Sequence, residues 1–180
     1  YIAKKNKPII LSTGMSEEKD LSLAVKTIKK YHSKFAILKC TSKYPASYKD
    51  LNLSSITKIK NKYNCSVGFS DHTLDNLAAN ISVVFGSTII EKHFKLDNDT
   101  TSTDSHFSSP ISSYQAIKKS LSDVDFCIGK KNLGFKISND QKKSRRSIYL
   151  CKDMKKNDEI NTYSIKSIRP GLGLHPKFLK

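Results

Sequence analysis

The chain is poor in arginine, and this shortage counts against one class of protein. Only Arg145, Arg146 and Arg169 are arginines among its 32 basic residues, and the lysines are spread along the chain rather than gathered in a patch. A nucleic-acid binder usually concentrates its basic residues and uses arginine for bidentate contacts to guanine and phosphate. The net charge of +16 raises the alternative of an anionic partner. The even spread favours a solvated lysine-rich surface without a nucleic-acid partner.

The sequence also lacks long apolar runs and paired cysteines. Its longest apolar runs, such as residues 35–38 and 82–85, fall far short of the roughly 20 residues that a helix needs to cross a bilayer. We therefore expect no membrane partner, and the first residues do not resemble a secretory signal peptide. No C-x-x-C or Cys/His pair has zinc-ligand spacing. The four cysteines are typical of buried reduced thiols in a cytoplasmic protein: Cys40, Cys65, Cys127 and Cys151.

What is present is a repeated strand–helix unit in a chain of 180 residues with the composition of a globular protein, 37% hydrophobic and 27% charged. Apolar runs at residues 9–11, 35–38, 67–69 and 88–90 each precede an amphipathic helical pattern. Short apolar strands that alternate with helices predict an α/β fold with a parallel sheet covered by helices. Polar residues follow every strand, where a (β/α)8 barrel or a doubly wound sheet places its ligand site, so the pattern alone leaves these two architectures open.

Local signals predict where the elements begin and where the pattern stops. Ser16 is a plausible N-cap of the first helix, and Ser109 and Pro110 are expected at the start of the fourth. The four units occupy residues 1–129. Residues 130–144 are polar and lysine-rich, which is typical of a linker. Strands expected at residues 147–151 and 165–168 then predict the start of a second, β-rich domain at residues 145–180.

Two histidines and three serines stand directly after the predicted strands. His72 and His93 follow consecutive strands, and neutral imidazole is a common ligand of divalent metals. The alternative is that both are hydrogen-bonded histidines at the rim of the sheet. The serines, whose hydroxyls could hold a phosphate at such positions, are Ser12, Ser42 and Ser70. Asp104, in a later loop, could accept hydrogen bonds from a polar substrate, although loop aspartates are more often turn formers.

Six strings in this order resemble the N-acetylneuraminate (sialic acid) synthase family: ILSTGM at 10–15, KCTSKYP at 39–45, GFSDHT at 68–73, IEKHF at 90–94, RRS at 145–147 and IRPG at 168–171. The resemblance covers nearly the whole chain. Within the family, LKCTS at 38–42, DSHFS at 104–108 and GLHPK at 173–177 look closer to the pseudaminic acid synthase branch. The resemblance to this family implies the C-terminal half of a (β/α)8 TIM barrel, followed by the truncated start of an antifreeze-like (SAF) domain.

The resemblance also implies an activity and roles for residues. The family condenses phosphoenolpyruvate with an open-chain N-acetylated amino sugar, as a transferase that forms a C–C bond and releases phosphate. By similarity, His72 and His93 would be catalytic as ligands of a divalent metal, Mn²⁺ first and Mg²⁺ or Co²⁺ as alternatives. Tyr44 and Asp104 would face the sugar, and Arg169 would reach it from the partner of a domain-swapped homodimer. The phosphoenolpyruvate-binding residues would be Ser12, Ser42 and Ser70, although serine at position 42 replaces the family's usual amide.

The family's first four strands carry its catalytic glutamate and the lysines that neutralise phosphoenolpyruvate. None of these lies in the 180 residues, so a trianionic ligand held by hydroxyls alone would lack charge compensation. We therefore expect this polypeptide to be inactive by itself. The alternatives are an N-acetylneuraminate or legionaminate synthase, or an inactive carbohydrate-binding fragment of such an enzyme.

Overall fold

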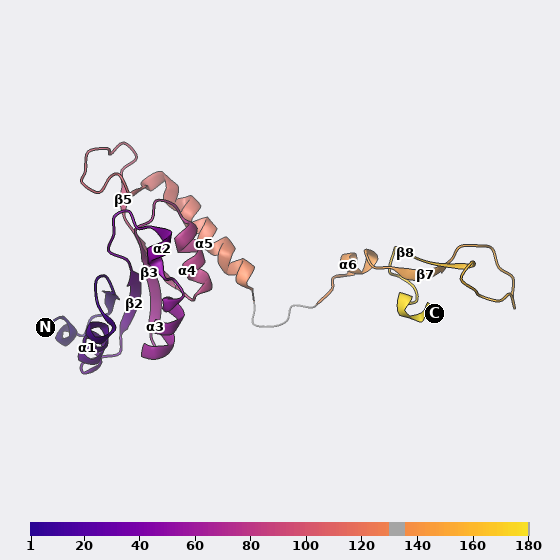
Figure 1. Cartoon of the computed structure of the whole chain (residues 1–180), viewed down its shortest axis with the longest axis horizontal. Helices are drawn as coiled ribbons and strands as arrows, with labels where there is room; N and C mark the ends of the chain where they lie inside the picture. The colour runs from indigo at the N-terminus through magenta and orange to yellow at the C-terminus, as the bar shows by residue number, and fades with distance from the viewer. Residues whose placement is uncertain (130–135, 180) are drawn as a thin grey trace. The chain divides into compact units, whose positions relative to one another are not determined.

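The structure is a computed structural model that describes residues 1–129 and 136–179 (Figure 1). The chain separates into two compact units, Tyr1–Gly129 and Lys130–Lys180. Each unit is described by itself below.

The first unit is built on a four-stranded parallel sheet. Its strands β1 (Ile9–Ser12), β2 (Phe35–Cys40), β3 (Ser66–Asp71) and β4 (Ile89–Lys92) lie in chain order, β1-β2-β3-β4. The register aligns Leu38 with Gly68, and Gly68 with Ile89. The predicted α/β fold with a parallel sheet is confirmed, and the curled sheet is a half-barrel. Each strand runs one or two residues past its predicted carboxyl end, because polar residues there still pair with the neighbouring strand.

Helices follow the strands as the alternating pattern predicts. They are η1 (Ile2–Lys5), α1 (Glu18–Lys29), α2 (Tyr48–Leu51), α3 (Ser55–Tyr63), α4 (Leu77–Val84), η2 (Ile111–Ser113) and α5 (Tyr114–Ile128). One apolar cluster joins Leu21, Val25 and Ile28 of α1 to Phe35 and Ile37 of β2. A second joins α3 and α4 to β3 through Ile56, Ala78, Val67 and Phe69. The core therefore lies between the sheet and its helices.

Two predicted helix starts are wrong. The first helix begins at Glu18 with Glu17 as its N-cap, because Glu17 and Asp20 form a reciprocal capping box that Ser16 does not make. Ser109 and Pro110 do not open a helix. They form the short strand β6 (Ser109–Pro110), which pairs in parallel with β5 (Phe94–Lys95). Because this pairing joins residues fifteen positions apart, the local Ser-Pro signal could not reveal it.

The inner face of the sheet, opposite the helices, carries small and apolar side chains. Side chains alternate between the two faces of a strand. Leu38, Gly68 and Ile89 are aligned across three neighbouring strands, so all three lie on this inner face. A Cβ atom added at Gly68 would lie 2.3 Å from the carbonyl oxygen of Ile89 and 2.5 Å from a methyl carbon of Leu38. Glycine at this position therefore allows Leu38 and Ile89 to close over β3, which accompanies the curl of the sheet.

The second unit contains a two-stranded antiparallel sheet of β7 (Ser147–Leu150) and β8 (Ile165–Ile168). The expected linker is not structureless throughout: α6 (Asn139–Lys143) has a capping box between Ser138 and Gln141. Residues 130–135 of that segment lie outside the described residues. A short helix, η3 (Pro176–Phe178), follows the sheet.

The four cysteines differ in their burial. Cys40, Cys65, Cys127 and Cys151 are all free, but only Cys40 is buried, and Cys127 and Cys151 are exposed. The expectation of four buried thiols is therefore wrong for these two, because Cys127 falls on the outward side of α5 and Cys151 follows an exposed strand end.

Within the described residues, no helix is long and apolar enough to cross a membrane.

Candidate functional site

The carboxyl ends of β3 and β4 bring two histidines together. His72 follows β3 and His93 follows β4, so the parallel sheet places both at the same edge. Their ring centres are 5.3 Å apart and the rings are close to perpendicular, at 74°. His72 is buried, whereas the side chain of His93 is 35% exposed. The site is therefore open to solvent on the His93 side.

Backbone contacts fix the orientation of His72. Its Nδ1 atom lies 2.9 Å from the carbonyl oxygen of Thr41, in the loop after β2. A carbonyl can only accept, so Nδ1 carries the hydrogen and the Nε2 lone pair is left available in the neutral ring. The carbonyl oxygen of His72 in turn accepts a bond from the amide of Ala46 at 2.9 Å. Two hydrogen bonds thus tie His72 to the loop that carries Tyr44.

An aromatic wall surrounds the histidine pair. The Tyr44 ring centre lies 4.3 Å from that of His72 and 5.7 Å from that of His93. The Phe107 ring centre lies 4.9 Å from His93 and 5.2 Å from Tyr44. Phe107 is 5% exposed although it belongs to a loop. This burial anchors the loop before β6 against the two histidines.

Asp104 comes to the site through the same loop. Its Oδ2 atom lies 3.5 Å from Nδ1 of His93. The loop is held by the β5–β6 pairing and by the amide of Ser109, which donates to the carbonyl oxygen of His93 at 3.0 Å. A carboxylate facing Nδ1 favours the tautomer with its hydrogen there and leaves Nε2 as a potential ligand.

The three predicted serines lie on the strand ends but differ in what they can offer. Ser12 is exposed and Ser42 is half-buried. Ser70 is buried, and its hydroxyl donates to Oε1 of Glu91 at 2.7 Å. The Thr13 hydroxyl accepts from the amide of Cys40 at 2.9 Å and so joins the end of β1 to that of β2. The Ser42 hydroxyl makes only a long contact of 4.0 Å with Sγ of Cys40, whereas the Ser70 hydroxyl is engaged by Glu91.

The lysines of β2 and β4 lie on the opposite, helix-covered face. Lys39 donates to the carbonyl oxygen of Cys40 at 2.9 Å and forms a longer contact with the Thr41 hydroxyl. Partial burial lowers the pKa of Lys39 below the usual lysine value. Because alternate residues face opposite ways, Lys39 shares its face with the core residue Ile37, whereas Ser12, aligned with Leu38, lies on the other face.

A buried ion pair supports the histidines from this helix-covered face. Lys92 Nζ lies 2.9 Å from Oδ2 of Asp71, and the two side chains are 4% and 0% exposed. Lys92 also donates to the carbonyl oxygens of Thr73 and Asp75 at 2.6 and 3.2 Å. Because Asp71 precedes His72 and Lys92 precedes His93, this pair locks together the two backbone segments that carry the imidazoles.

The histidine pair suits a divalent metal only as part of a ligand set. Within residues 1–129 and 136–179, no group of three or more His, Cys, Asp and Glu side chains could hold an ion. His72 and His93 are nevertheless close, and with Nδ1 engaged on each ring Nε2 is the remaining ligand atom; catalytic metal sites also keep coordination positions open for water or substrate. The donors therefore fit such a metal as two of its ligands.

Sequence reasoning found Tyr44, His72, His93 and Asp104, which the structure brings together, but it missed three supporting residues. Glu91 and Lys92 lie in the same string as His93 and could have been noticed as charges beside a strand end. Phe107 is the single large hydrocarbon side chain between Asp97 and Ser109, which is a usable signal. Arg169 belongs to the second unit, where it is exposed and directly follows β8 (Ile165–Ile168).

Two histidines, an aspartate and an aromatic wall thus gather at the strand ends of a half-barrel, which is where barrel folds place their active sites. The sequence pattern of the NeuB family matches residues 1–132. The chain therefore belongs to this family of sialic-type acid synthases, and the resemblance drawn from the six motifs is confirmed.

The chain is also similar to named proteins and to a solved structure. It is 39% identical over 183 residues to the pseudaminic acid synthase of Campylobacter jejuni, covering 98% of this chain and 52% of that protein. It is 33% identical to the N,N'-diacetyllegionaminic acid synthase of Legionella pneumophila, covering 98% and 51%. The crystal structure of N-acetylneuraminic acid synthetase from Leptospira borgpetersenii, in complex with citrate, superposes with a TM-score of 0.71 at 30% identity, covering 75% of this chain and 47% of that one. The chain thus spans about half the length of the curated relatives it matches.

Proposed function

We propose that this chain supplies half of the active site of a nonulosonic acid synthase. The enzyme condenses phosphoenolpyruvate with an N-acetylated amino sugar to give pseudaminic acid, or a related sugar acid, and phosphate, for surface polysaccharide or glycoprotein biosynthesis. The observation that carries the proposal is the pair of histidines at adjacent strand ends, 5.3 Å apart and flanked by Tyr44 and Asp104. Its named relatives include pseudaminic and legionaminic acid synthases.

His72 and His93 would hold the divalent metal, Mn²⁺ before Mg²⁺ or Co²⁺. Bound there, the ion supplies Lewis-acid polarisation of the sugar aldehyde. The chain's own contribution is orientation. Thr41 holds the His72 ring through Nδ1, and Asp104 faces Nδ1 of His93, so on both rings Nε2 is the atom left to bind the ion.

In the proposed reaction, carbon 3 of phosphoenolpyruvate forms a bond to the aldehyde carbon of the sugar. Water adds to carbon 2, and the tetrahedral intermediate expels phosphate to leave a ketone. Ser12 and Ser42 donate to the phosphoenolpyruvate, and Ser70 acts beside them by holding Glu91. Tyr44 and Asp104 face the sugar, and the half-exposed Tyr44 ring offers an apolar surface for an acetamido methyl group.

The second unit and the dimer belong to the same proposal. The hairpin of β7 and β8 would be the start of an antifreeze-like (SAF) domain, and its exposed Arg169 would reach the sugar of the partner subunit in a domain-swapped homodimer. Phosphoenolpyruvate is a cytoplasmic metabolite, so the proposal places the reaction in the cytoplasm. The 180 residues alone should release no phosphate, because the cations that neutralise phosphoenolpyruvate lie outside them.

A chimera tests this function. Residues 1–180 replace the matching segment of the Campylobacter jejuni relative, and product formation from phosphoenolpyruvate and a panel of N-acetylated amino sugars is read by mass spectrometry. We expect a nine-carbon sugar acid together with released phosphate. The sugar that reacts fastest distinguishes a pseudaminic from a legionaminic or neuraminic acid synthase. A folded chimera that makes no product with any sugar would support the inactive carbohydrate-binding alternative and would overturn the proposal.

A metal-binding measurement tests the two proposed ligands separately. Mn²⁺ binding to the chimera is followed by electron paramagnetic resonance. His72→Ala and His93→Ala should each weaken binding at least about tenfold, the effect expected of losing a ligand. His175→Ala, an exposed histidine of the second unit, should leave it unchanged. Equal affinity in all three variants would remove the metal from this pair of residues.

A further inference from the structure

The loop between β5 and β6, residues 96–108, is exposed along most of its length but carries one large buried side chain. Phe107 is 5% exposed, whereas Leu96, the loop's other large apolar residue, is 66% exposed. The partners that bury Phe107 are the rings of His93 and Tyr44. The loop is thus attached, through one side chain, to two residues of the candidate site.

A tight turn joins Phe107 to Asp104. The carbonyl oxygen of Asp104 accepts from the amide of Phe107 at 3.3 Å, and from the amide and the hydroxyl of Ser108 at 3.1 and 2.7 Å. Both ends of this turn contact His93. The Phe107 ring centre lies 4.9 Å from that of His93 at an angle of 62°, and Oδ2 of Asp104 lies 3.5 Å from its Nδ1. The hydrogen bonds of the turn therefore couple the place of the carboxylate to the place of the buried ring.

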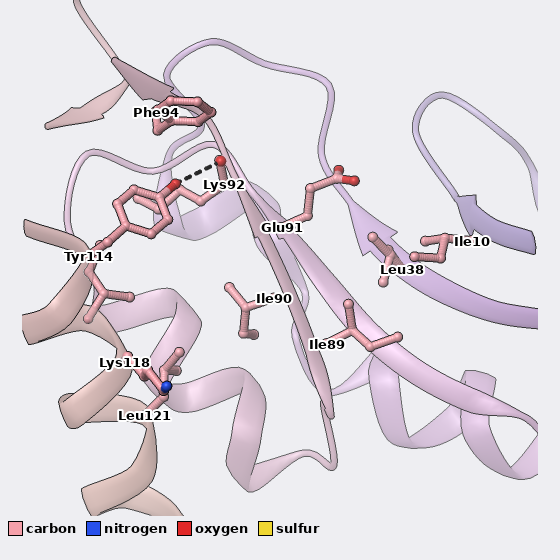
Figure 2. Close-up of a pocket in the computed structure, with 11 residues that line it drawn as sticks. Ile10, Leu38, Ile89, Ile90, Glu91, Lys92, Phe94, Tyr114, Lys118 and Leu121 are labelled. Atoms are coloured by element: carbon pink, nitrogen blue, oxygen red, sulfur yellow. Dashed lines mark hydrogen bonds between the residues drawn. The ribbon is translucent and has the colours of Figure 1, made fainter. Parts of the chain in front are cut away.

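The base of the loop is held independently of this turn. The amide of Ser109 donates to the carbonyl oxygen of His93 at 3.0 Å, and β5 pairs with β6. The hydroxyl of Tyr114 donates to the carbonyl oxygen of Lys92 at 3.0 Å, and the Phe94 ring packs edge-on against the Tyr114 ring (Figure 2). Strands β4 and β5 therefore stay in place when the turn is loosened. What the turn itself fixes is the orientation of the His93 ring.

We propose that Phe107 is a positioning residue for His93. The inference deepens the proposed function and rests on it, since there His93 binds the ion while Tyr44 and Asp104 face the sugar. By filling the space between the Tyr44 and His93 rings, Phe107 fixes the plane of the imidazole. Through the turn it also brings Asp104 to Nδ1. The carboxylate keeps the hydrogen on Nδ1, so that Nε2 is the atom left to bind the ion.

The tautomer of His93 in the 180-residue chain tests this role, because the measurement needs neither an ion nor activity. With the imidazoles neutral, nitrogen NMR of labelled histidines should place the hydrogen of His93 on Nδ1 in the wild type. Phe107→Ala and Asp104→Ala should each shift His93 to a mixture of tautomers. Their combination should shift it no further than either change alone, since both break the same contact. His72, held by the Thr41 carbonyl, should keep its tautomer in every variant.

Two further variants separate positioning from a general loss of stability. Ile117→Ala, at a residue of α5 that is 6% exposed, should lower the unfolding midpoint but leave the His93 tautomer unchanged. Phe107→Leu keeps most of the buried volume, so it should fold and shift the tautomer less than Phe107→Ala. The inference is overturned if His93 keeps its wild-type tautomer in a folded Phe107→Ala chain or in Asp104→Ala, whose side chain is exposed. An equal shift in Ile117→Ala overturns it too.

The chimera gives a second readout. Phe107→Ala should weaken Mn²⁺ binding about tenfold, as expected of losing a residue that orients a metal ligand. It should also raise the KM of the sugar more than that of phosphoenolpyruvate, because Tyr44 and Asp104 face the sugar. Ile117→Ala should change neither value. An active chimera in which Phe107→Ala alters neither value refutes the inference and leaves the proposed function standing. A chimera without product whose His93 tautomer still shifts counts against the function and supports the placing of His93 by Phe107.

Discussion

Removing the ammonium group of Lys92 should destabilise the first unit more than any single surface change. Lys92 is the cation that faces the fully buried Asp71, and it donates to three oxygens, at 2.9, 2.6 and 3.2 Å. The other carboxylate oxygen, Oδ1, keeps its bonds from the amide and hydroxyl of Thr73 at 2.8 Å. In Lys92→Met, Oδ2 is left charged and buried. Breaking a buried pair in this way costs about 3–5 kcal/mol, a large share of the roughly 5–15 kcal/mol that stabilises a domain.

Urea unfolding followed by circular dichroism measures this cost, and two further variants isolate its cause. Asp71→Asn in the Lys92→Met background keeps the acceptor for Thr73 but removes the unpaired charge, so the double variant should recover a large part of the loss. Lys119→Met breaks the exposed pair with Asp123, which should cost no more than about 1 kcal/mol. If Lys92→Met costs as little as Lys119→Met, the reasoning about the buried pair is wrong.

Two other predictions concern the sheet and the loop after β2. Gly68→Ala should lower the free energy of unfolding by about 1–3 kcal/mol, because the new methyl group would meet the Ile89 carbonyl and Leu38. Gly129→Ala is the comparison, since nothing lies within 4 Å of its Cβ position, although its φ of +65° carries a backbone cost of its own. An unfolding free energy unchanged by Gly68→Ala would mean that Leu38 and Ile89 do not close over β3. For Lys39, burial depresses the folded-state pKa below the ordinary 10.5. Between these two pKa values the unfolded chain binds more protons, so stability should rise with pH as the folded lysine loses its proton. Unfolding midpoints measured against pH should show this rise in the wild type and a smaller one in Lys39→Met; identical profiles would contradict the assignment.

Much of the first unit could be predicted from local pattern. Four apolar runs separated by helical stripes are sufficient to predict parallel strands, since such strands are buried on both faces and need helices as crossovers. The positions of His72 and His93 at one edge follow from that topology, because the carboxyl ends of parallel strands meet. The proximity of Asp104 and Tyr44 to the histidines could be expected from the family resemblance, and the structure shows both contacts.

Other features depend on pairings between distant segments. The loop after β5 turns back onto His93 because Ser109–Pro110 pairs with Phe94–Lys95 and because Phe107 is buried against Tyr44 and His93. No local signal distinguishes a Ser-Pro helix start from a short strand. The sequence pattern also did not reveal what Ser70 and Lys92 contact. Each acts through a partner 21 residues away in the chain, Glu91 for Ser70 and Asp71 for Lys92.

The sequence by itself determined the order of strands and helices, the polar character of the strand ends and the family to which the chain belongs. These depend on periodicity and on motifs within a few residues. Only the tertiary structure decided which hydroxyls are engaged and which lysine is buried in an ion pair. Those properties arise from cross-strand register and burial, which bring together side chains that the sequence keeps far apart.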